Sequence, residues 1–273
     1  MDEPTTPAPL PSSPAPPPAL GLQAFGVSEC GPYRPGNEDA FTVDLERGLF
    51  VVADGMGGHA AGEIASRLAV ESIQAFIARS EGDTDLTWPF GLDSSLSTDA
   101  NRLRTALHLA NQRVFRAAAS DPAYAGMGTT VVAVLFTPSA IVVGHAGDSR
   151  VYEERDGQLV ALTADDSLLN ALGELQLSPE AHAQHPLRNV VTNVLGGDEQ
   201  ILAHMSERPR APGRRVVLCS DGVHGTLDDG RIGGILAAES DPRRVAERLV
   251  ADAIAAGGRD NATALVVVDG ETA

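Results

Sequence analysis

The sequence predicts an α+β architecture built on antiparallel sheets. Two amphipathic helical patterns follow one another before residue 121, with only a loop between them. Runs rich in β-branched residues then follow one another directly between residues 128 and 163. The regular alternation of strand and helix that builds a parallel sheet is therefore missing, which favours the α+β class.

Composition divides the chain into a short tail and one globular domain. Residues 1–19 consist mainly of Pro, Ala, Ser and Thr, which favour an extended, disordered segment. Hydrophobic residues make up 43% of the 273 residues, which is enough for a substantial core. We therefore expect one folded domain over residues 20–273 behind a Pro-rich tail.

Charge, hydropathy and cysteine usage disfavour several classes of protein. The net charge of −17 disfavours binding to nucleic acid. No apolar run reaches the length of a membrane span, and no signal-peptide pattern follows the N-terminus. Cys30 and Cys219 lie far apart and outside any metal-ligand spacing, which indicates reduced thiols. These features predict a cytoplasmic protein that binds neither nucleic acid nor membranes.

The first half of the domain contains one buried strand pattern and the two helices. The strand pattern covers residues 48–53, and the first helix covers residues 62–78. A loop over residues 80–96 leads to the second helix, which Ser97 or Thr98 caps. The apolar stripe of the first helix comprises Ile64, Ala65, Leu68, Ala69, Ile73, Phe76 and Ile77, and that of the second comprises Leu103, Ala106, Leu107, Ala110 and Val114.

The second half of the domain is rich in strands. Strand patterns cover residues 128–138, 140–155, 158–163, 215–220 and 262–269. Asp156-Gly157 predicts a hairpin, because strand patterns flank this turn signal on both sides. A small helix is expected to open at Ser178, and a long one begins at Asp241-Pro242 and stops at Gly257-Gly258.

Four aspartates lie at the ends of these strand patterns. They are Asp54, Asp148, Asp221 and Asp260. If the strand ends converge, the carboxylates repel one another unless a cation lies between them. Mg²⁺ and Mn²⁺ prefer oxygen ligands, so the set predicts a divalent metal site. Glycine after Asp54 lets the backbone come close, which makes the Gly55 carbonyl a further candidate ligand.

The glycine-rich stretch after Asp54 also has a competing interpretation. Gly55-x-Gly57-x-x-Ala60 matches the fingerprint of a dinucleotide-binding enzyme, which requires a parallel sheet. Against this match, the Asp54 carboxylate would lie beside the pyrophosphate without a compensating lysine. The fingerprint alone is a weak signal, and the metal site is the favoured interpretation.

A charged cluster, RPGNED, lies upstream at residues 34–39. Arg34 carries a planar guanidinium that suits a pair of phosphate oxygens. Glu38 and Asp39 add two further carboxylates. Taken alone, such a cluster is more typical of a charged surface turn.

Six motifs taken together resemble those of metal-dependent type 2C Ser/Thr protein phosphatases in their bacterial form. They are RPGNEDAF, VVADGMGGH, GMGTTVVAV, GHAGDSRVY, LCSDG and GRDNATALVVV, and the resemblance covers residues 21–269. It implies a four-layer α-β-β-α sandwich of two antiparallel sheets flanked by helix pairs. It also implies hydrolysis of phosphoserine and phosphothreonine in proteins, by a hydroxide bridging two Mn²⁺ or Mg²⁺ ions and without a covalent intermediate.

The resemblance implies how the two core ions are held. Asp54 matches the carboxylate that bridges them, and Asp221 and Asp260 match the other ligands of the first ion. The Gly55 carbonyl matches a ligand of the second ion. Asp54 and Asp221 are accordingly expected to be essential for catalysis.

The resemblance also implies roles for the remaining charged residues. Glu38 or Asp39 is expected to act at the second ion, directly or through water. Asp148 matches a ligand of a third, weaker metal site shared with Asp221. Arg34 matches the group that binds the substrate phosphate during catalysis.

The sequence departs from the wider family at two positions that bear on chemistry. Met56 stands where animal members carry a histidine thought to be the general acid, and His59 three residues later is more typical of a structural histidine. Gln184, in a variable segment over residues 164–200, stands where some bacterial members have a serine at the third metal site. The proton donor and the full ligand set of the third ion therefore stay open.

The resemblance implies phosphorylated proteins as partners, namely Ser/Thr kinases or the substrates of such kinases. The domain is expected to act in signal transduction as a monomer. An alternative is a pseudo-phosphatase, a module that binds phosphoproteins without turnover. That alternative predicts the loss of a core metal ligand, and the motifs retain all of them.

Overall fold

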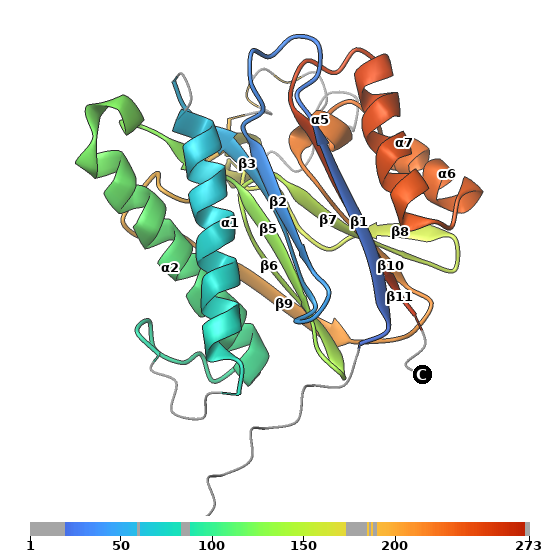
Figure 1. The fold of residues 1–273 in the computed structure, drawn as a ribbon, viewed down its shortest axis with the longest axis horizontal. Coiled ribbons are helices and arrows are strands. Elements are labelled where there is room, and N and C mark those ends of the chain that lie inside the picture. The colour runs from blue at the N-terminus through green and yellow to red at the C-terminus, as the bar shows by residue number, and fades with distance from the viewer. Residues whose placement is uncertain are drawn as a thin grey trace, which may run out of the picture.

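The computed structural model describes residues 20–58, 61–82, 88–172, 185, 187 and 190–270. In this part of the chain, two antiparallel β-sheets face each other, and helices cover the outer face of each sheet (Figure 1). The predicted four-layer α-β-β-α sandwich is therefore confirmed. The Pro-rich tail over residues 1–19 and the small helix expected at Ser178 lie outside the described residues.

The strands form one sheet of six and one sheet of five. The six-stranded sheet has the order β2 (Asp39–Asp44), β3 (Leu49–Met56), β5 (Val131–Phe136), β6 (Ala140–Ala146) and β9 (His204–Pro209), and β4 (Gly128–Thr129) pairs with the end of β3. The five-stranded sheet has the order β1 (Leu22–Glu29), β11 (Ala262–Asp269), β10 (Arg215–Cys219), β7 (Arg150–Arg155) and β8 (Gln158–Ala161). The predicted hairpin at Asp156-Gly157 joins β7 to β8.

The polarity of the strands around Val51 decides between the two interpretations of the glycine-rich stretch. β3, which contains Val51, is antiparallel to both of its neighbours, β2 and β5. The dinucleotide-binding interpretation required a parallel sheet here, and that expectation is wrong.

Helices pack on both outer faces of the sandwich. Helices α1 (Ala61–Ser80) and α2 (Thr98–Ser120) cover the six-stranded sheet, and α5 (Asp221–His224), α6 (Asp229–Ala238) and α7 (Pro242–Ala255) cover the five-stranded sheet. Two single turns, η1 (Pro122–Tyr124) and α3 (Leu168–Ala171), complete the helices of the described residues. Of the two candidate caps for α2, Ser97 is the cap, because its hydroxyl accepts a hydrogen bond from the Ala100 amide. None of the described helices has the length and apolar character needed to cross a membrane.

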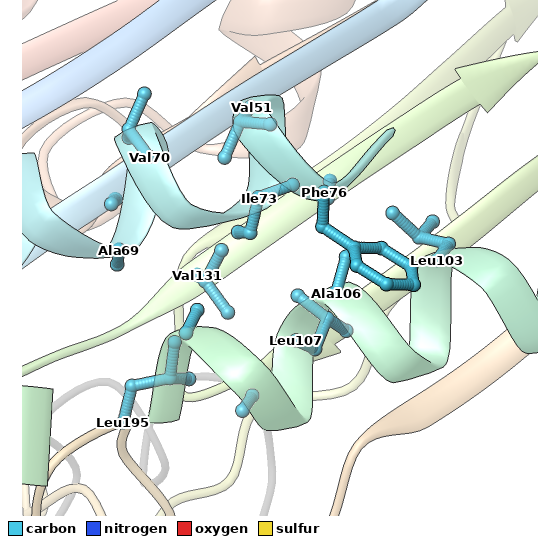
Figure 2. Packing of buried hydrophobic residues seen from close by; sticks show 14 of the residues in the cluster. Val51, Ala69, Val70, Ile73, Phe76, Leu103, Ala106, Leu107, Val131 and Leu195 are labelled. Atoms are coloured by element: carbon cyan, nitrogen blue, oxygen red, sulfur yellow. The ribbon is translucent and has the colours of Figure 1, made fainter. Parts of the chain in front are cut away.

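Apolar side chains fill the spaces between the layers. Both faces of β3 are buried, which explains its uninterrupted apolar sequence. Leu49, Val51 and Ala53 belong to the cluster that includes residues of α1 and α2. Figure 2 shows Val51 together with residues of both helices in this cluster. Phe50 and Val52 point the opposite way, into the cluster between the two sheets. Every residue of the two predicted helical stripes belongs to the first cluster or packs against it.

Several elements are absent from the prediction. The strands β1, β2 and β9 lie at sheet edges, where partial exposure mixes polar and apolar residues and weakens the strand pattern. Helix α6 contains Gly230, Gly233 and Gly234, and glycine has a low helix propensity. These elements complete the sandwich but leave the predicted layers unchanged.

The strand pattern over residues 140–155 forms two strands that lie in different sheets. β6 belongs to the six-stranded sheet and β7 to the five-stranded sheet. Gly147 has a φ of +107°, and a Cβ there would lie 2.6 Å from the Cβ of Thr130. Gly147 thus allows the chain to cross between the sheets, which leaves Asp148 between them.

Candidate metal centre

The two sheets bring the predicted acidic residues together at one end of the sandwich. Asp54 lies near the end of β3, Asp221 follows β10, and Asp260 precedes β11. Asp148 lies in the crossing between β6 and β7. These four carboxylates line one hollow of about 190 Å³, together with Arg34, Glu38 and Gly55. Of the predicted site residues, only Asp39 is missing from the lining.

The carboxylates lie close enough to perturb one another. Burial, followed by repulsion from Asp39, Asp221 and other carboxylates, raises the pKa of Asp54 well above its usual value. Burial likewise raises the pKa of Asp148 to about 7, with the Asp221 charge as the second cause. Burial and the charge of Asp260 raise the pKa of Asp221 as well. A cation in this hollow would remove that repulsion.

Unpartnered oxygens show where a cation fits. Asp221 Oδ1, Glu38 Oε1 and Asp39 Oδ1 are buried and accept no hydrogen bond within the described part of the chain. A buried oxygen without a partner is costly unless an ion or water satisfies it. Carboxylate and carbonyl oxygens are the ligands that Mn²⁺ and Mg²⁺ prefer, so the donor set fits these ions.

Glu38 and Asp39 occupy different positions. Glu38 lines the hollow, next to Gly62 in the first turn of α1. Asp39 lies behind Asp54, directly opposite it in the β2–β3 register. Its Oδ2 accepts hydrogen bonds from the hydroxyls of Ser220 and Thr263, at 2.8 Å and 2.6 Å. Glu38 is therefore the better placed of the two for contact with an ion.

Gly55 lies where no side chain fits. A Cβ on Gly55 would come within 2.1 Å of the Gly62 carbonyl oxygen and 2.6 Å of the Glu38 carbonyl oxygen. β3 also continues past the predicted end at Ala53, because Gly55 pairs with Thr129 of β4. The backbone of Gly55 is thus fixed in the wall of the hollow, as the proposed carbonyl ligand requires.

Arg34 forms an ion pair within the site. Its guanidinium donates to Asp260 Oδ2 at 2.5 Å, and both side chains are partly exposed. This pairing keeps the positive charge of Arg34 in the wall of the hollow. On the other side, His224 holds the loop of Asp148, because its Nε2 donates to the Asp148 carbonyl at 2.9 Å. Burial lowers the pKa of His224 to about 4, so this imidazole is neutral at pH 7.

The positions that depart from the family divide between described and undescribed residues. Met56 lines the hollow, so a thioether stands in the wall and supplies no proton. His59 and Gln184 lie outside the described residues. From the variable segment over residues 164–200, Val191 reaches the lining.

Asn261 is a site residue that the sequence analysis missed. Its side chain is 3% exposed and holds the loop of residues 30–38 against Asp260. The amide donates to the carbonyls of Cys30 and Gly36, and Oδ1 accepts from the Glu38 amide at 2.8 Å. Asn261 directly follows Asp260 in the last motif. An uncharged polar residue just before a buried strand is the sequence feature that could have identified it.

A second group of metal-binding side chains lies outside the hollow. Potential ligand atoms of His145, Asp166 and His204 lie within 4.8 Å of one another. These side chains already have partners within the protein. His204 Nε2 lies 2.8 Å from Asp166 Oδ1, and His145 Nε2 forms a hydrogen bond with the Ala164 carbonyl. Asp166 Oδ2 also accepts a hydrogen bond from the Gly147 amide. The group therefore acts as a support for the turn that carries Asp148.

Comparisons with known proteins identify the family. A family model described as protein phosphatase 2C matches residues 36–252, so the chain belongs to the protein phosphatase 2C family. The serine/threonine protein phosphatase PstP of Mycobacterium tuberculosis is 35% identical over 257 residues, covering 92% of this chain and 46% of PstP. The chain thus spans about half the length of that relative.

One further relative and one solved domain match over nearly their whole length. Protein phosphatase PhpP of Streptococcus pneumoniae is 32% identical, with 88% of this chain and 95% of PhpP covered. The catalytic domain of PstP, solved in complex with two manganese ions, superposes with a TM-score of 0.76 at 31% identity. That superposition covers 92% of this chain and 99% of the solved domain.

Proposed function

We propose that the chain hydrolyses phosphoserine and phosphothreonine in proteins, with two Mn²⁺ or Mg²⁺ ions as cofactors. The observation that carries the proposal is the convergence of four aspartates on one hollow, with buried oxygens that have no other partner. The family and the named activities of the relatives support the same conclusion.

The chain's own residues divide the work. Asp54 would hold both ions, with Asp221 and Asp260 completing the first site and the Gly55 carbonyl the second. Glu38 would act at the second ion, and Asp39 would orient Asp54 from behind. When bound, the two ions supply a water activated for attack on phosphorus and neutralise charge on the phosphoryl group.

Arg34 and Asp148 complete the proposed site. Arg34 binds the substrate phosphate through its planar fork, which orients the phosphoryl group toward the hollow. Asp148, with a pKa near 7, exchanges a proton readily at neutral pH unless a third ion holds it. Met56 offers no proton, so the leaving group takes its proton from elsewhere.

The experiment measures hydrolysis of p-nitrophenyl phosphate and of phosphoserine and phosphothreonine peptides with Mn²⁺, with and without EDTA. We expect activity that requires the metal and is lost in Asp54→Ala. A matched phosphotyrosine peptide tests the restriction to serine and threonine. Activity that survives EDTA, or an Asp54→Ala variant as active as the wild type, would contradict the metal-dependent mechanism.

The pseudo-phosphatase alternative makes an opposite prediction for metal binding. A module without turnover should bind no Mn²⁺ at the core pair, whereas the proposed enzyme should bind two ions by calorimetry. Phosphopeptide binding that is unaffected by EDTA and is not followed by phosphate release would favour the alternative.

We further propose that the protein acts in the cytoplasm as a monomer and opposes Ser/Thr protein kinases. The surplus of carboxylates fits a protein that stays apart from nucleic acid. A comparison of phosphoproteomes between the wild type and an Asp221→Ala strain tests the role. Phosphoserine and phosphothreonine sites should accumulate in the variant strain, and an unchanged phosphoproteome would contradict the proposal.

A further inference from the structure

A second, larger hollow adjoins the proposed reaction centre. Its volume is about 660 Å³, against about 190 Å³ for the hollow that carries the metal ligands. The two hollows share the side chains of Arg34, Asp148, Asp221 and Asp260 in their walls. Protein pockets of this size hold ligands far larger than one phosphate. The larger hollow therefore has room for a substrate residue adjacent to the phosphorylated residue.

The arginines that line the larger hollow differ in the ion pairs and hydrogen bonds that they already make. Arg34 is paired with Asp260. Arg150 donates two hydrogen bonds of 2.8 Å to the Asp165 carboxylate and a third to the Tyr152 hydroxyl. Arg259 is exposed and makes no ion pair or hydrogen bond with any residue that the structure describes. The guanidinium of Arg259 is thus available to a ligand.

The backbone on both sides of Arg259 is fixed. Helix α7 ends one turn before it, where the Gly258 amide donates to the Ala253 carbonyl at 3.1 Å. Gly257 has a φ of +93°, which turns the chain out of the helix. On the other side, Asp260 Oδ1 accepts a hydrogen bond from the Asn261 amide. The backbone of Arg259 is therefore held at a fixed position in the wall of the larger hollow, directly before the proposed metal ligand Asp260.

We propose that Arg259 selects substrates that carry an anionic group beside the phosphorylated serine or threonine. The ligand is a pair of anionic oxygens, from an Asp or Glu carboxylate or from a second phosphoryl group. The inference rests on the proposed phosphatase function. A guanidinium binds either oxygen pair through two parallel hydrogen bonds, which gives geometric selectivity as well as affinity. The carboxylates in the shared wall do not oppose this binding once cations neutralise them.

The test measures kcat/KM on matched phosphothreonine peptides. One set places Asp, a second phosphoserine or neutral Asn at each position within about four residues of the phosphothreonine. We expect the wild type to prefer an anionic residue at one position roughly tenfold, a change typical of one charge-assisted pair. The Asp and phosphoserine arms show which source of the anion is preferred.

The variants isolate Arg259. Arg259→Ala should remove the preference through a higher KM, and Arg259→Glu should transfer it to peptides with Lys at the same position. Arg155→Ala is the matched control, because Arg155 is an exposed arginine at the end of β7 that does not line the hollow. Thermal unfolding and Mn²⁺ calorimetry of each variant show that the fold and the metal sites are intact.

The outcomes separate this inference from the proposed function. A wild type that hydrolyses all peptides equally, or a preference that persists in Arg259→Ala, overturns the inference alone. A wild type that hydrolyses no peptide with Mn²⁺ overturns the proposed function and the inference with it. Transfer of the preference in Arg259→Glu supports both.

Discussion

At the scale of single residues, Asp54 has opposite effects on metal binding and on the stability of the metal-free fold. Its pKa is raised by burial and by neighbouring carboxylates, so ionised Asp54 destabilises the fold when no cation is present. Asp54→Asn keeps the size of the side chain and removes the charge. We expect the variant to lose more than about 100-fold in activity, since the substitution removes a proposed direct metal ligand.

The same variant should be more stable than the wild type in EDTA at pH 8. Urea unfolding with and without Mn²⁺ measures both effects. In the wild type Mn²⁺ should raise the unfolding midpoint, whereas in Asp54→Asn the shift should be small. An Asp54→Asn protein that is less stable than the wild type in EDTA would show that the carboxylates do not repel one another.

Gly222 shows how closely the backbone packs around the site. A Cβ on Gly222 would lie 1.9 Å from the Asn261 carbonyl oxygen. Gly222→Ala must therefore push apart the two segments that carry Asp221 and Asp260. We expect a loss of about 3 kcal/mol or more in the free energy of unfolding, together with weaker Mn²⁺ binding. Both are measured by urea unfolding and calorimetry.

Gly234 provides the matched control. It lies on the exposed face of α6, and nothing lies within 4 Å of a Cβ placed there. Gly234→Ala should therefore stabilise the protein by about 0.5–1 kcal/mol through helix propensity, without an effect on metal binding. Equal losses of stability in the two variants would contradict the packing argument.

At the scale of elements, Asp166 connects the turn of Asp148 to the chain on either side of it. Its carboxylate accepts hydrogen bonds from the Gly147 backbone amide at 3.0 Å and from the Asn193 side-chain amide at 2.7 Å. It also lies 2.8 Å from His204 Nε2. Asp166→Ala removes this acceptor from all three donors. We expect a loss of about 2–4 kcal/mol in the free energy of unfolding, measured in urea.

The positioning role of Asp166 also predicts an effect on metal binding. Because Gly147 carries Asp148 into the site, the Asp166→Ala variant should bind Mn²⁺ about tenfold more weakly in calorimetry. Glu199→Ala, at an exposed position in the loop after Asn193, serves as the control and should change neither quantity. Unaltered Mn²⁺ binding in a destabilised Asp166→Ala protein would limit its role to stability.

The elements that the sequence predicts are those with one dominant signal. Buried strands such as β3 and helices with a single apolar stripe are visible because both depend on local burial. The edge strands β1, β2 and β9 are missed because partial exposure mixes polar and apolar residues in their sequences. The crossing at Gly147 is missed for another reason, because only the placement of β6 and β7 in different sheets distinguishes it from a continuous strand.

At the scale of the whole molecule, the site exists because two sheets meet. Asp54 lies in β3 of one sheet and Asp221 lies just after β10 of the other sheet, so no local pattern could place them side by side. The residue types are predictable from the sequence, because an Asp lies at the end of each of these strand patterns. The choice of Glu38 over Asp39 needed the hydroxyls of Ser220 and Thr263, which are distant in sequence.

The convergence of carboxylates makes the stability of the whole metal-free protein depend on pH. Burial raises the pKa of Asp39 to about 6 and that of Asp148 to about 7, from 3.8 in an unfolded chain. The folded state thus binds more protons than the unfolded state between these values, and stability falls as the pH rises through them. Buried His145 and His224 act in the opposite direction below pH 6.5, because burial lowers their pKa values.

Above pH 6.5 the carboxylates therefore dominate, and the free energy of unfolding in EDTA should fall between pH 6.5 and 8. Asp148→Asn should reduce this slope, since the variant lacks the carboxyl group with a pKa of about 7. With saturating Mn²⁺ the slope should vanish or reverse, because ions bind the deprotonated carboxylates and bind more tightly as the pH rises. Urea unfolding at each pH measures all three cases. A metal-free protein whose stability rises between pH 6.5 and 8 would show that the acidic residues do not form one interacting centre.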